Sequence, residues 1–327
     1  MMTSINLNCL ITDNHTINAS YMKASQYSHL IFTSGQIMNN ELWVPSNSTI
    51  LPSKTDQYTI GWQGDFYDSK FTAEINAYYK SMYNLATIKE GYTGILGDEN
   101  WMSKIETGGQ GTAKGLELMV RKTSGSFTGF ASYTLSNSTR QFANINKGNE
   151  YLFDYDRLHS FSINLNYKIN DKLNINATWI YQTGMPYTPV IGKMRIPNTN
   201  PYSDEPYSEA YIYDERNSAK MKDSHRLDIG LTYSKFTKRR HLPCEWTFSI
   251  YNVYNRQNPY TYFYGKEWTS LNPSDINSER YYEIFLYQRA YLPIIPSFSY
   301  KVYFNSKTLK NDVQRKDRKY DKWLFYE

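Results

Sequence analysis

The side chains that could perform enzymatic chemistry are scattered along this sequence of 327 residues. The histidines are His15, His29, His159, His225 and His241. They form no cluster with the cysteines Cys9 and Cys244 and no HExxH pattern, so the sequence lacks the ligand spacing that a zinc site requires. Asp156, Arg157 and His159 could suggest acid–base catalysis, but they stand at the start of a predicted strand, where a structural role is the simpler explanation. We therefore predict that the chain is not an enzyme and binds no metal or other cofactor.

A glycine cluster, Gly108-Gly109-Gln110-Gly111, resembles a phosphate-binding loop. Such a loop acts together with the N-terminus of a following helix, and no helical periodicity follows here. The glycines are better explained as positions where a strand bends or another segment approaches closely. The two cysteines lie in separate strand-like segments, and we expect no disulfide because the predicted fold does not depend on one.

Aromatic side chains in the long polar segments are the best candidates for ligand binding. Their faces could stack on sugar rings or on an aromatic siderophore. The alternative for each of them is packing within a loop or in an aromatic belt at a membrane boundary. These residues are Trp101, Tyr187, Tyr202, Tyr207, Tyr211, Tyr213 and Trp268.

The elements that must position these residues are β-strands. Apolar and polar residues alternate in about a dozen segments, and no comparable helical period occurs. In the clearest case Phe161, Ile163 and Leu165 alternate with Ser162, Asn164 and other polar residues. The pattern recurs at 173–179, 227–233, 246–250 and 298–304. Many segments exceed the ~5–6 residues common in soluble strands. The sequence therefore predicts an all-β protein.

Composition argues against both a soluble globular protein and a disordered one. Tyr occurs 32 times and aromatic residues make up 17% of the chain, whereas Leu, Ile and Val are sparse. This aliphatic content would not fill a closed soluble core, and disordered chains are poor in aromatics. No apolar run approaches the ~18 residues of a transmembrane helix. Much of the net charge of +5 lies in 307–322, so no nucleic-acid partner is indicated. A polar interior with a short apolar outer band is typical of a membrane β-barrel.

The connections between the predicted strands alternate between short and long. Short ones fall at 13–15, 67–69, 122–125, 170–172, 238–241 and around Arg289; long ones fall at 35–54, 89–103, 141–156, 184–222 and 258–279. Outer-membrane barrels alternate short periplasmic turns with long external loops, and a β-sandwich gives no reason for this rhythm. We predict about 12 strands, with the first strand starting and the last one ending on the periplasmic side.

Unbroken alternation also predicts which side chains face lipid. The apolar set comprises Phe161, Ile163, Leu165, Leu173, Ile175, Leu227, Ile229 and Leu231. The set expected to point inward comprises Asn164, Asn166, Asn174 and Asn176. Packing of the apolar set against a second sheet would instead indicate a soluble sandwich.

Several segments resemble the barrels of TonB-dependent outer-membrane receptors, in particular those with a carboxypeptidase-regulatory-like N-terminal module. One is Glu41-Leu42-Trp43-Val44-Pro45 with the following Ile50-Leu51-Pro52, and another is Gly108 to Leu118. Later ones are Thr183-Gly184-Met185-Pro186-Tyr187 and Tyr251-Asn252-Val253-Tyr254-Asn255. The resemblance lies in their order and spacing over residues 5–304.

The resemblance implies an antiparallel transmembrane barrel of about 22 strands, of which this sequence matches only the C-terminal part. The family's plug, TonB box and N-terminal module have no counterpart here. Met1 to Asn8 do not resemble a signal peptide, so we expect a fragment of a longer outer-membrane protein. We divide the chain into barrel, 1–304, and a charged tail, 305–327. Phe304, the last aromatic residue of the last strand, resembles the signal read by the barrel-assembly machinery.

The resemblance further implies a bacterial outer-membrane receptor that imports a large nutrient, such as a siderophore, glycan or peptide, energised through TonB. Its expected partners are outer-membrane lipid, the barrel-assembly machinery and, only through the missing N-terminal part, the TonB complex. Two alternatives remain: a complete 12-stranded outer-membrane pore or hydrolase, and a soluble surface protein that binds carbohydrate. Because open sheet edges are not tolerated in hydrocarbon, the isolated chain should aggregate or pair 5–11 with 298–304.

Overall fold

The computed structural model describes residues 2–33, 40–92, 100–198, 207–237, 242–270 and 280–303. In this part of the chain the helical segments are η1 (Trp101–Lys104) and η2 (Asn146–Gly148), single turns of 3₁₀ helix. No helix among these residues is long and apolar enough to cross a membrane.

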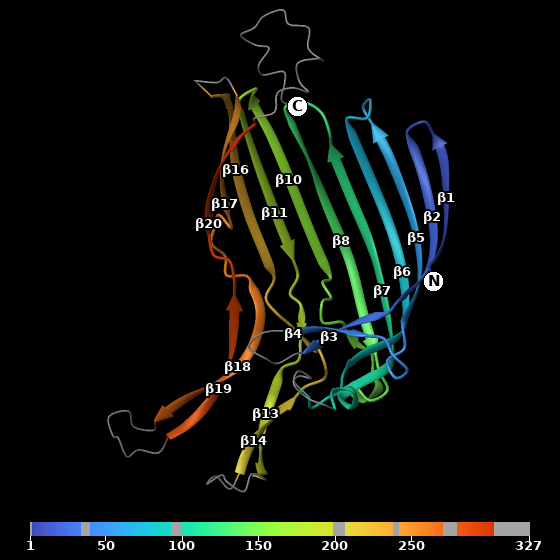
Figure 1. Ribbon diagram of the computed structural model, residues 1–327, viewed down its shortest axis with the longest axis vertical. Helices are drawn as coiled ribbons and strands as arrows, with labels where there is room; N and C mark the ends of the chain where they lie inside the picture. The colour runs from blue at the N-terminus through green and yellow to red at the C-terminus, as the bar shows by residue number, and fades with distance from the viewer. Residues whose placement is uncertain are drawn as a thin grey trace, which may run out of the picture.

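One antiparallel sheet dominates the molecule (Figure 1). Its long strands follow one another as neighbours, and β9 (Tyr151–Leu152) is a two-residue addition beside β8. In order across the sheet they are β1 (Thr3–Thr12), β2 (His15–Gln26), β5 (Ser53–Phe66), β6 (Phe71–Ile88), β7 (Ile105–Lys122), β8 (Phe127–Gln141), β10 (His159–Asn170), β11 (Leu173–Gln182), β16 (Ser224–Phe236), β17 (Pro243–Tyr251) and β20 (Ile295–Val302). The predicted all-β fold of about 12 antiparallel strands is confirmed.

Short turns gather at one end of the sheet and long connections at the other, as predicted (Figure 1). We call these the turn end and the loop end. Three hairpins lie at the loop end: β3 (Ser28–Thr33) with β4 (Asn40–Pro45), β13 (Val190–Pro197) with β14 (Tyr207–Tyr213), and β18 (Pro259–Ser270) with β19 (Arg280–Ala290). The only other pair outside the main sheet in the described residues is β12 (Pro186–Tyr187) with β15 (Ala219–Lys220).

The predicted turn around Arg289 is wrong. Arg289 lies inside β19 opposite Thr261 of β18, and β17 pairs directly with β20. The strands β18 and β19 therefore form a projecting hairpin and are not part of the main sheet, which we call the wall. Period-2 alternation is the same in both settings and could not separate them. With eleven long strands alternating in direction, β1 and β20 both run toward the turn end. The predicted periplasmic start of the first strand is therefore also wrong, because β1 begins nearer the loop end.

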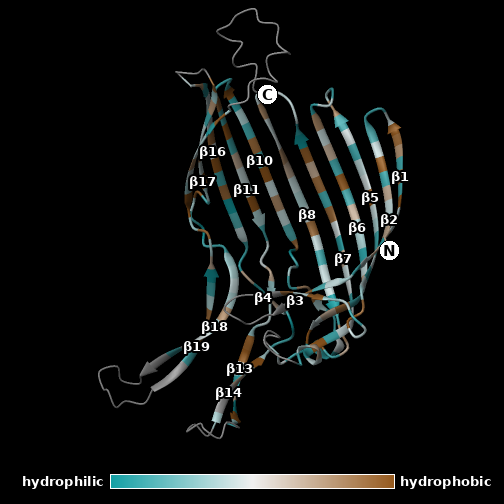
Figure 2. Cartoon of the chain, in the orientation of Figure 1, coloured by the Kyte–Doolittle hydropathy of each residue, from teal (hydrophilic) through white to brown (hydrophobic). Residues whose placement is uncertain are grey.

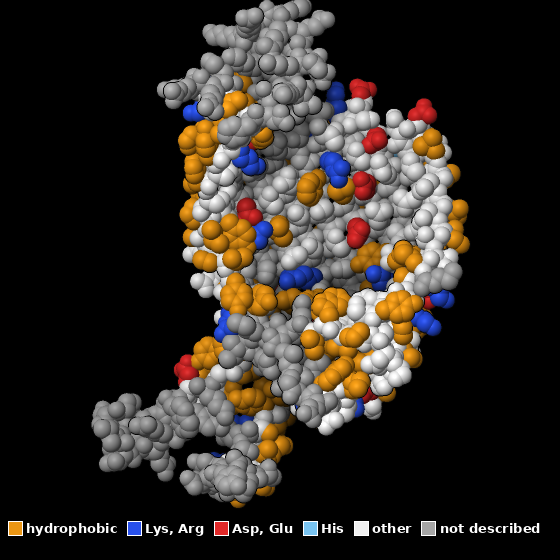
Figure 3. Space-filling model, in the orientation of Figure 1, with side chains coloured by type: hydrophobic (Ala, Val, Ile, Leu, Met, Phe, Trp, Pro, Cys, Tyr) orange, Lys and Arg blue, Asp and Glu red, His pale blue; other side chains and the backbone are white. Residues whose placement is uncertain are grey.

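Strand register separates the two predicted sets of side chains onto opposite faces of the sheet. Ile163 lies opposite Trp179, and Trp179 opposite Leu227, in one apolar row. Asn164 lies opposite Thr178 on the other face and donates a hydrogen bond from Nδ2 to Thr178 Oγ1 at 2.8 Å. The alternation is visible in Figure 2 along long strands such as β6, β7 and β10. Figure 3 looks onto a face where Lys, Arg, Asp and Glu side chains lie among uncharged polar ones, with hydrophobic side chains along both margins.

No second sheet covers the apolar face among the described residues. Leu165 is 36% exposed and Ile229 and Leu231 are each 38% exposed. Most of the buried apolar side chains instead form two small clusters at the loop end. The first comprises Ile31, Val44, Ile50, Ile88 and Ile105; the second comprises Phe142, Ile145 and Tyr151. These observations exclude the sandwich and agree with an apolar face that meets lipid.

The two edges of the sheet are not paired with each other. In the described residues β1 pairs only with β2 and β20 pairs only with β17, and all ten residues of β1 are exposed. The expected closure of 5–11 on 298–304 is therefore not found. Cys9, on the β1 edge, and Cys244, buried on β17, are both free.

The assignment of faces can be tested with two neighbouring residues of β10. Leu165→Arg would place a charge on the lipid face and should destabilise the inserted wall by about 2–4 kcal/mol. Asn166→Arg, the matched control, places the same side chain on the polar face opposite Asn176 and should be tolerated. Heat-modifiable mobility in membranes measures both. Equal loss of the inserted form in the two variants would contradict the assignment.

Candidate functional site

A cavity of about 400 Å³ lies at the loop end. Four stretches line it: the end of β6 and the residues after it (88–92), the segment after β9 (154–155), the connection from β11 to β16 (parts of 185–221), and β18 (261–264). Residues far apart in the sequence therefore meet there. Its volume falls in the range typical of small-ligand sites.

Tyrosine rings form much of the cavity wall. Tyr187 meets Tyr262 edge to face, with ring centroids 5.1 Å apart, and Tyr211 contacts both Tyr213 and Tyr264 at 6.3 and 6.5 Å. Burial and neighbouring tyrosines raise the pKa of Tyr187 and of Tyr213 above the ordinary value. Both hydroxyls therefore stay protonated at neutral pH.

Polar groups in the cavity wall are held by hydrogen bonds. Asn217 is 5% exposed, and its Nδ2 donates to Leu152 O at 2.7 Å and to Asp154 Oδ1 at 3.0 Å. Glu90 Oε1 accepts from the backbone N–H of Asn146 at 2.7 Å. The Arg216 guanidinium lies 5.4 Å from the centre of the Tyr151 ring. Burial raises the pKa of Tyr151 to about 12, so this ring is neutral. The lining of the cavity is thus preorganised by side chains that bind one another.

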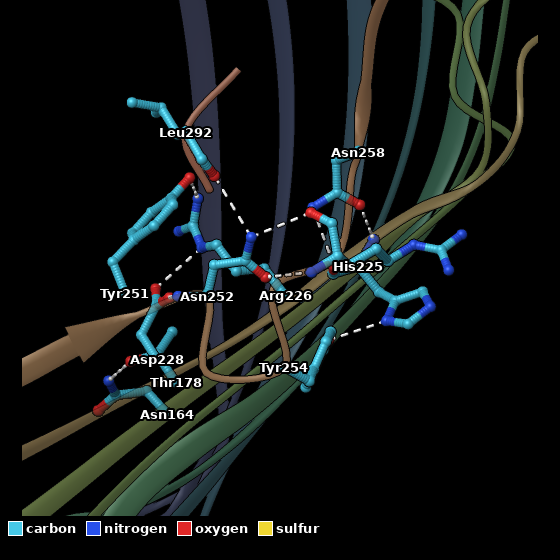
Figure 4. A network of polar contacts seen from close by, with 11 residues as sticks. Asn164, Thr178, His225, Arg226, Asp228, Tyr251, Asn252, Tyr254, Asn258 and Leu292 are labelled. Atoms are coloured by element: carbon cyan, nitrogen blue, oxygen red, sulfur yellow. Dashed lines mark hydrogen bonds and ion pairs between the residues drawn. The ribbon is translucent and has the colours of Figure 1, made fainter. Parts of the chain in front are cut away.

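A buried network at the rim of the sheet fixes where the β18–β19 hairpin leaves the wall (Figure 4). Asn252 is fully buried and has φ of 55°, a left-handed conformation that asparagine adopts more readily than most residues. Its backbone N–H donates to Asp228 Oδ1 at 2.9 Å, and its Nδ2 donates to Leu292 O at 3.3 Å and to Arg256 O at 3.0 Å. Asn252 therefore connects β16 to the chain that enters β20.

Asp223 extends this network to other segments near the cavity. Its Oδ2 accepts from the Tyr181 hydroxyl at 2.6 Å, its Oδ1 from the Gly184 N–H at 3.0 Å, and its carbonyl from Arg256 Nη2 at 2.8 Å. The Tyr181 hydrogen bond is the main cause that lowers the pKa of Asp223. Gly184, Asp223 and Arg256 each stand just before or after a segment that lines the cavity. Through its carboxylate and its backbone carbonyl, Asp223 thus connects three segments that lead into the cavity lining.

The structure brings three of the predicted binding residues, Tyr187, Tyr211 and Tyr213, into one cavity. Trp101 instead packs against the first buried cluster, and Tyr207 lies 58% exposed at the outer end of β14, opposite Pro197. Tyr202, Phe304 and the side chain of Trp268 lie outside the described residues.

Sequence reasoning missed several residues of the cavity wall. Tyr262 and Tyr264 line the cavity but are not among the predicted binding residues, although the sequence predicts a long loop at 258–279, which contains them. Glu90, Asp154 and Arg216 carry no local signal, because their positions depend on contacts between segments 56 to 70 residues apart, such as Arg216 N–H to Asn146 Oδ1. The described residues contain no group of three or more His, Cys, Asp or Glu that could hold a metal ion.

Gly184 offers a test of how tightly the cavity wall is built. A Cβ at this position would come within 1.7 Å of the Met221 carbonyl oxygen, so Gly184→Ala must displace backbone. We expect it to destabilise the loop end by about 1–3 kcal/mol. At Gly192 the nearest atom to an added Cβ is Ile212 Cδ1 at 3.6 Å, so Gly192→Ala should have little effect. Limited proteolysis of the two variants measures this, and equal cleavage rates would show that the close approach is unimportant.

Solved structures similar to this chain are outer-membrane receptors. The siderophore receptor PiuA from Acinetobacter baumannii is 15% identical with a TM-score of 0.51, and the match covers 78% of this chain and 32% of that receptor. The ferric-catecholate import receptor Fiu from E. coli K12 is 14% identical with a TM-score of 0.49, covering 78% and 31%. For the ferripyoverdine receptor of Pseudomonas aeruginosa the values are 14%, 0.48, 79% and 29%. At such identities the PiuA match describes the fold alone.

This chain spans about a third of the length of those solved receptors. No curated protein sequence matches it. The family model described as the β-barrel of TonB dependent receptor-like proteins matches residues 3–312, which is nearly the whole chain. The protein therefore belongs to the TonB-dependent receptors, a family of outer-membrane transport receptors and not of enzymes, and it forms part of their β-barrel.

Proposed function

We propose that the receptor to which this wall belongs imports a large nutrient across the outer membrane, energised through TonB. The observation that carries the proposal is the tyrosine-lined cavity, which lies at the loop end of a β-sheet that belongs to the barrel of this family. Loops at that end are the external ones in outer-membrane barrels, so the cavity would meet ligands arriving from outside.

We further propose that the plug, the TonB box and the remaining wall strands lie outside these 327 residues. Two observations support this: the chain spans about a third of the solved receptors, and β1 and β20 each have a free edge in the described sheet. Unpaired backbone groups at such edges are not tolerated in hydrocarbon, so additional strands would be needed to complete the wall. Contact with TonB would then be made by the other part of the receptor.

Growth experiments in the host test the import proposal. Deleting the coding region should slow growth when one nutrient class limits it: iron as a siderophore complex, a glycan or peptides. In a strain that lacks TonB, the same deletion should have no further effect, because transport would already be abolished. A defect that persists without TonB would indicate a passive pore. The absence of a defect on every medium would contradict the proposal.

The division at Phe304 is a separate proposal, in which outer-membrane lipid surrounds the apolar face and the barrel-assembly machinery reads the terminal aromatic residue. Within this tail, residues 307–322 alternate charges with few apolar positions, so they could bury little surface. Truncating an export-competent chain after Phe304 should leave insertion unchanged or improve it, as measured by heat-modifiable mobility in membranes. Loss of insertion on truncation would show that the closing segment has been misassigned.

A further inference from the structure

The charges of the loop-end cavity disfavour an anionic ligand. Three carboxylates line it, those of Glu90, Asp154 and Asp214, against two cations, Lys89 and Arg216. Lys89 Nζ donates to the Ser103 carbonyl at 2.8 Å, and the Arg216 guanidinium lies against the Tyr151 ring. A ferric complex with net negative charge would meet an excess of like charge, which is destabilising.

Two tyrosine hydroxyls in the cavity are arranged as hydrogen-bond donors. Tyr262 OH accepts from the backbone N–H of Lys222 at 3.1 Å, and Tyr264 OH accepts from the N–H of Val190 at 2.8 Å. A tyrosine hydroxyl that accepts one hydrogen bond retains its own O–H to donate. These two residues can therefore donate to oxygen atoms of a ligand.

The carboxylates supply the complementary acceptors. Asp154 accepts from Asn217, Glu90 from Asn146, and Asp214 Oδ2 from Ser218 Oγ at 2.9 Å. Each carboxylate has about four lone-pair sites, so one such bond leaves further acceptor capacity. The cavity thus combines donors, acceptors and aromatic faces.

We propose that the loop-end cavity binds an uncharged, multiply hydroxylated segment of a glycan; this inference rests on the proposed import function. A sugar hydroxyl both donates and accepts, so it can pair with tyrosine O–H groups and carboxylates together. The apolar face of a sugar ring can also lie on tyrosine rings such as Tyr187 and Tyr211. A lysine side chain has only hydrogen-bond donors, so a basic peptide could pair with the carboxylates but its side chains could not accept from the tyrosine O–H groups.

Binding to the protein as its host makes it, solubilised from the outer membrane in detergent, tests this inference. The probes are neutral hexasaccharides of an α-glucan, a β-glucan and a fructan, with ferric citrate, a ferric tricatecholate and trilysine as charged probes. By calorimetry we expect a neutral glycan to bind. Its affinity should change less than about twofold between about 50 and 500 mM NaCl, because a neutral ligand is not screened by salt.

Three variants connect binding to the cavity. Tyr187→Ala should weaken glycan binding about tenfold through loss of stacking, whereas Tyr187→Phe keeps the ring and should retain most of it. Tyr207→Ala removes an exposed tyrosine outside the cavity lining and should have no effect. Equal losses for Tyr187→Ala and Tyr207→Ala would place binding elsewhere and overturn the inference.

Other results also overturn it: preferential binding of a ferric complex or of trilysine, an affinity that falls about tenfold or more with salt, or no binding of any probe. The growth experiment separates this inference from the import proposal. TonB-dependent growth on a ferric siderophore would support the import proposal and contradict the inference of a glycan ligand. Growth independent of TonB would refute import itself.

Discussion

Backbone hydrogen bonding in a medium without water is the constraint on which this structure depends. Each wall strand in hydrocarbon must pair its N–H and C=O groups with its neighbours, because lipid offers no partner. Pairing from β1 to β20 supplies this stabilisation without a packed interior, so residues such as Asn166 and Asn176 can occupy the polar face. Apolar cores in the described residues are confined to the loop end, where connections must pack as in soluble proteins.

The loop end owes its geometry to hydrogen-bonded polar residues as much as to these small cores. Asn252, which is fully buried, and Asp223, which is half-buried, join the wall strands to the segments that lead into the cavity lining, and each of these bonds has a backbone group on at least one side. Such bonds are costly to break when buried, since the partner is left unsatisfied. The cavity is therefore positioned by the rim of the wall, and a ligand site on long connections can still be rigid.

The sequence was sufficient to predict the strands of the wall and their two faces, but it was insufficient to predict the residues that line the cavity. Alternation around Asn164 and Leu165 identified both faces, because each strand repeats the same two-residue period. The same period gave a wrong prediction at 280–290, because apolar and polar residues alternate in a projecting hairpin as they do in a wall strand. Tyr187, Tyr211 and Tyr213 could be proposed from their place in a long connection. Asp154 and Arg216 could not, because only tertiary contacts bring them to the cavity.

The shared direction of β1 and β20 limits what can complete the wall. If every pair of neighbouring strands is antiparallel, the strands added beside β1 and beside β20 must both run toward the loop end. Because the added strands alternate in direction, their number must be odd. A second copy of this chain in the same membrane orientation would instead meet both edges along parallel seams. Closure of the sheet on itself would also create one parallel seam. Strand directions alone thus show that an odd number of additional strands can complete an antiparallel barrel, whereas a second copy of this chain cannot.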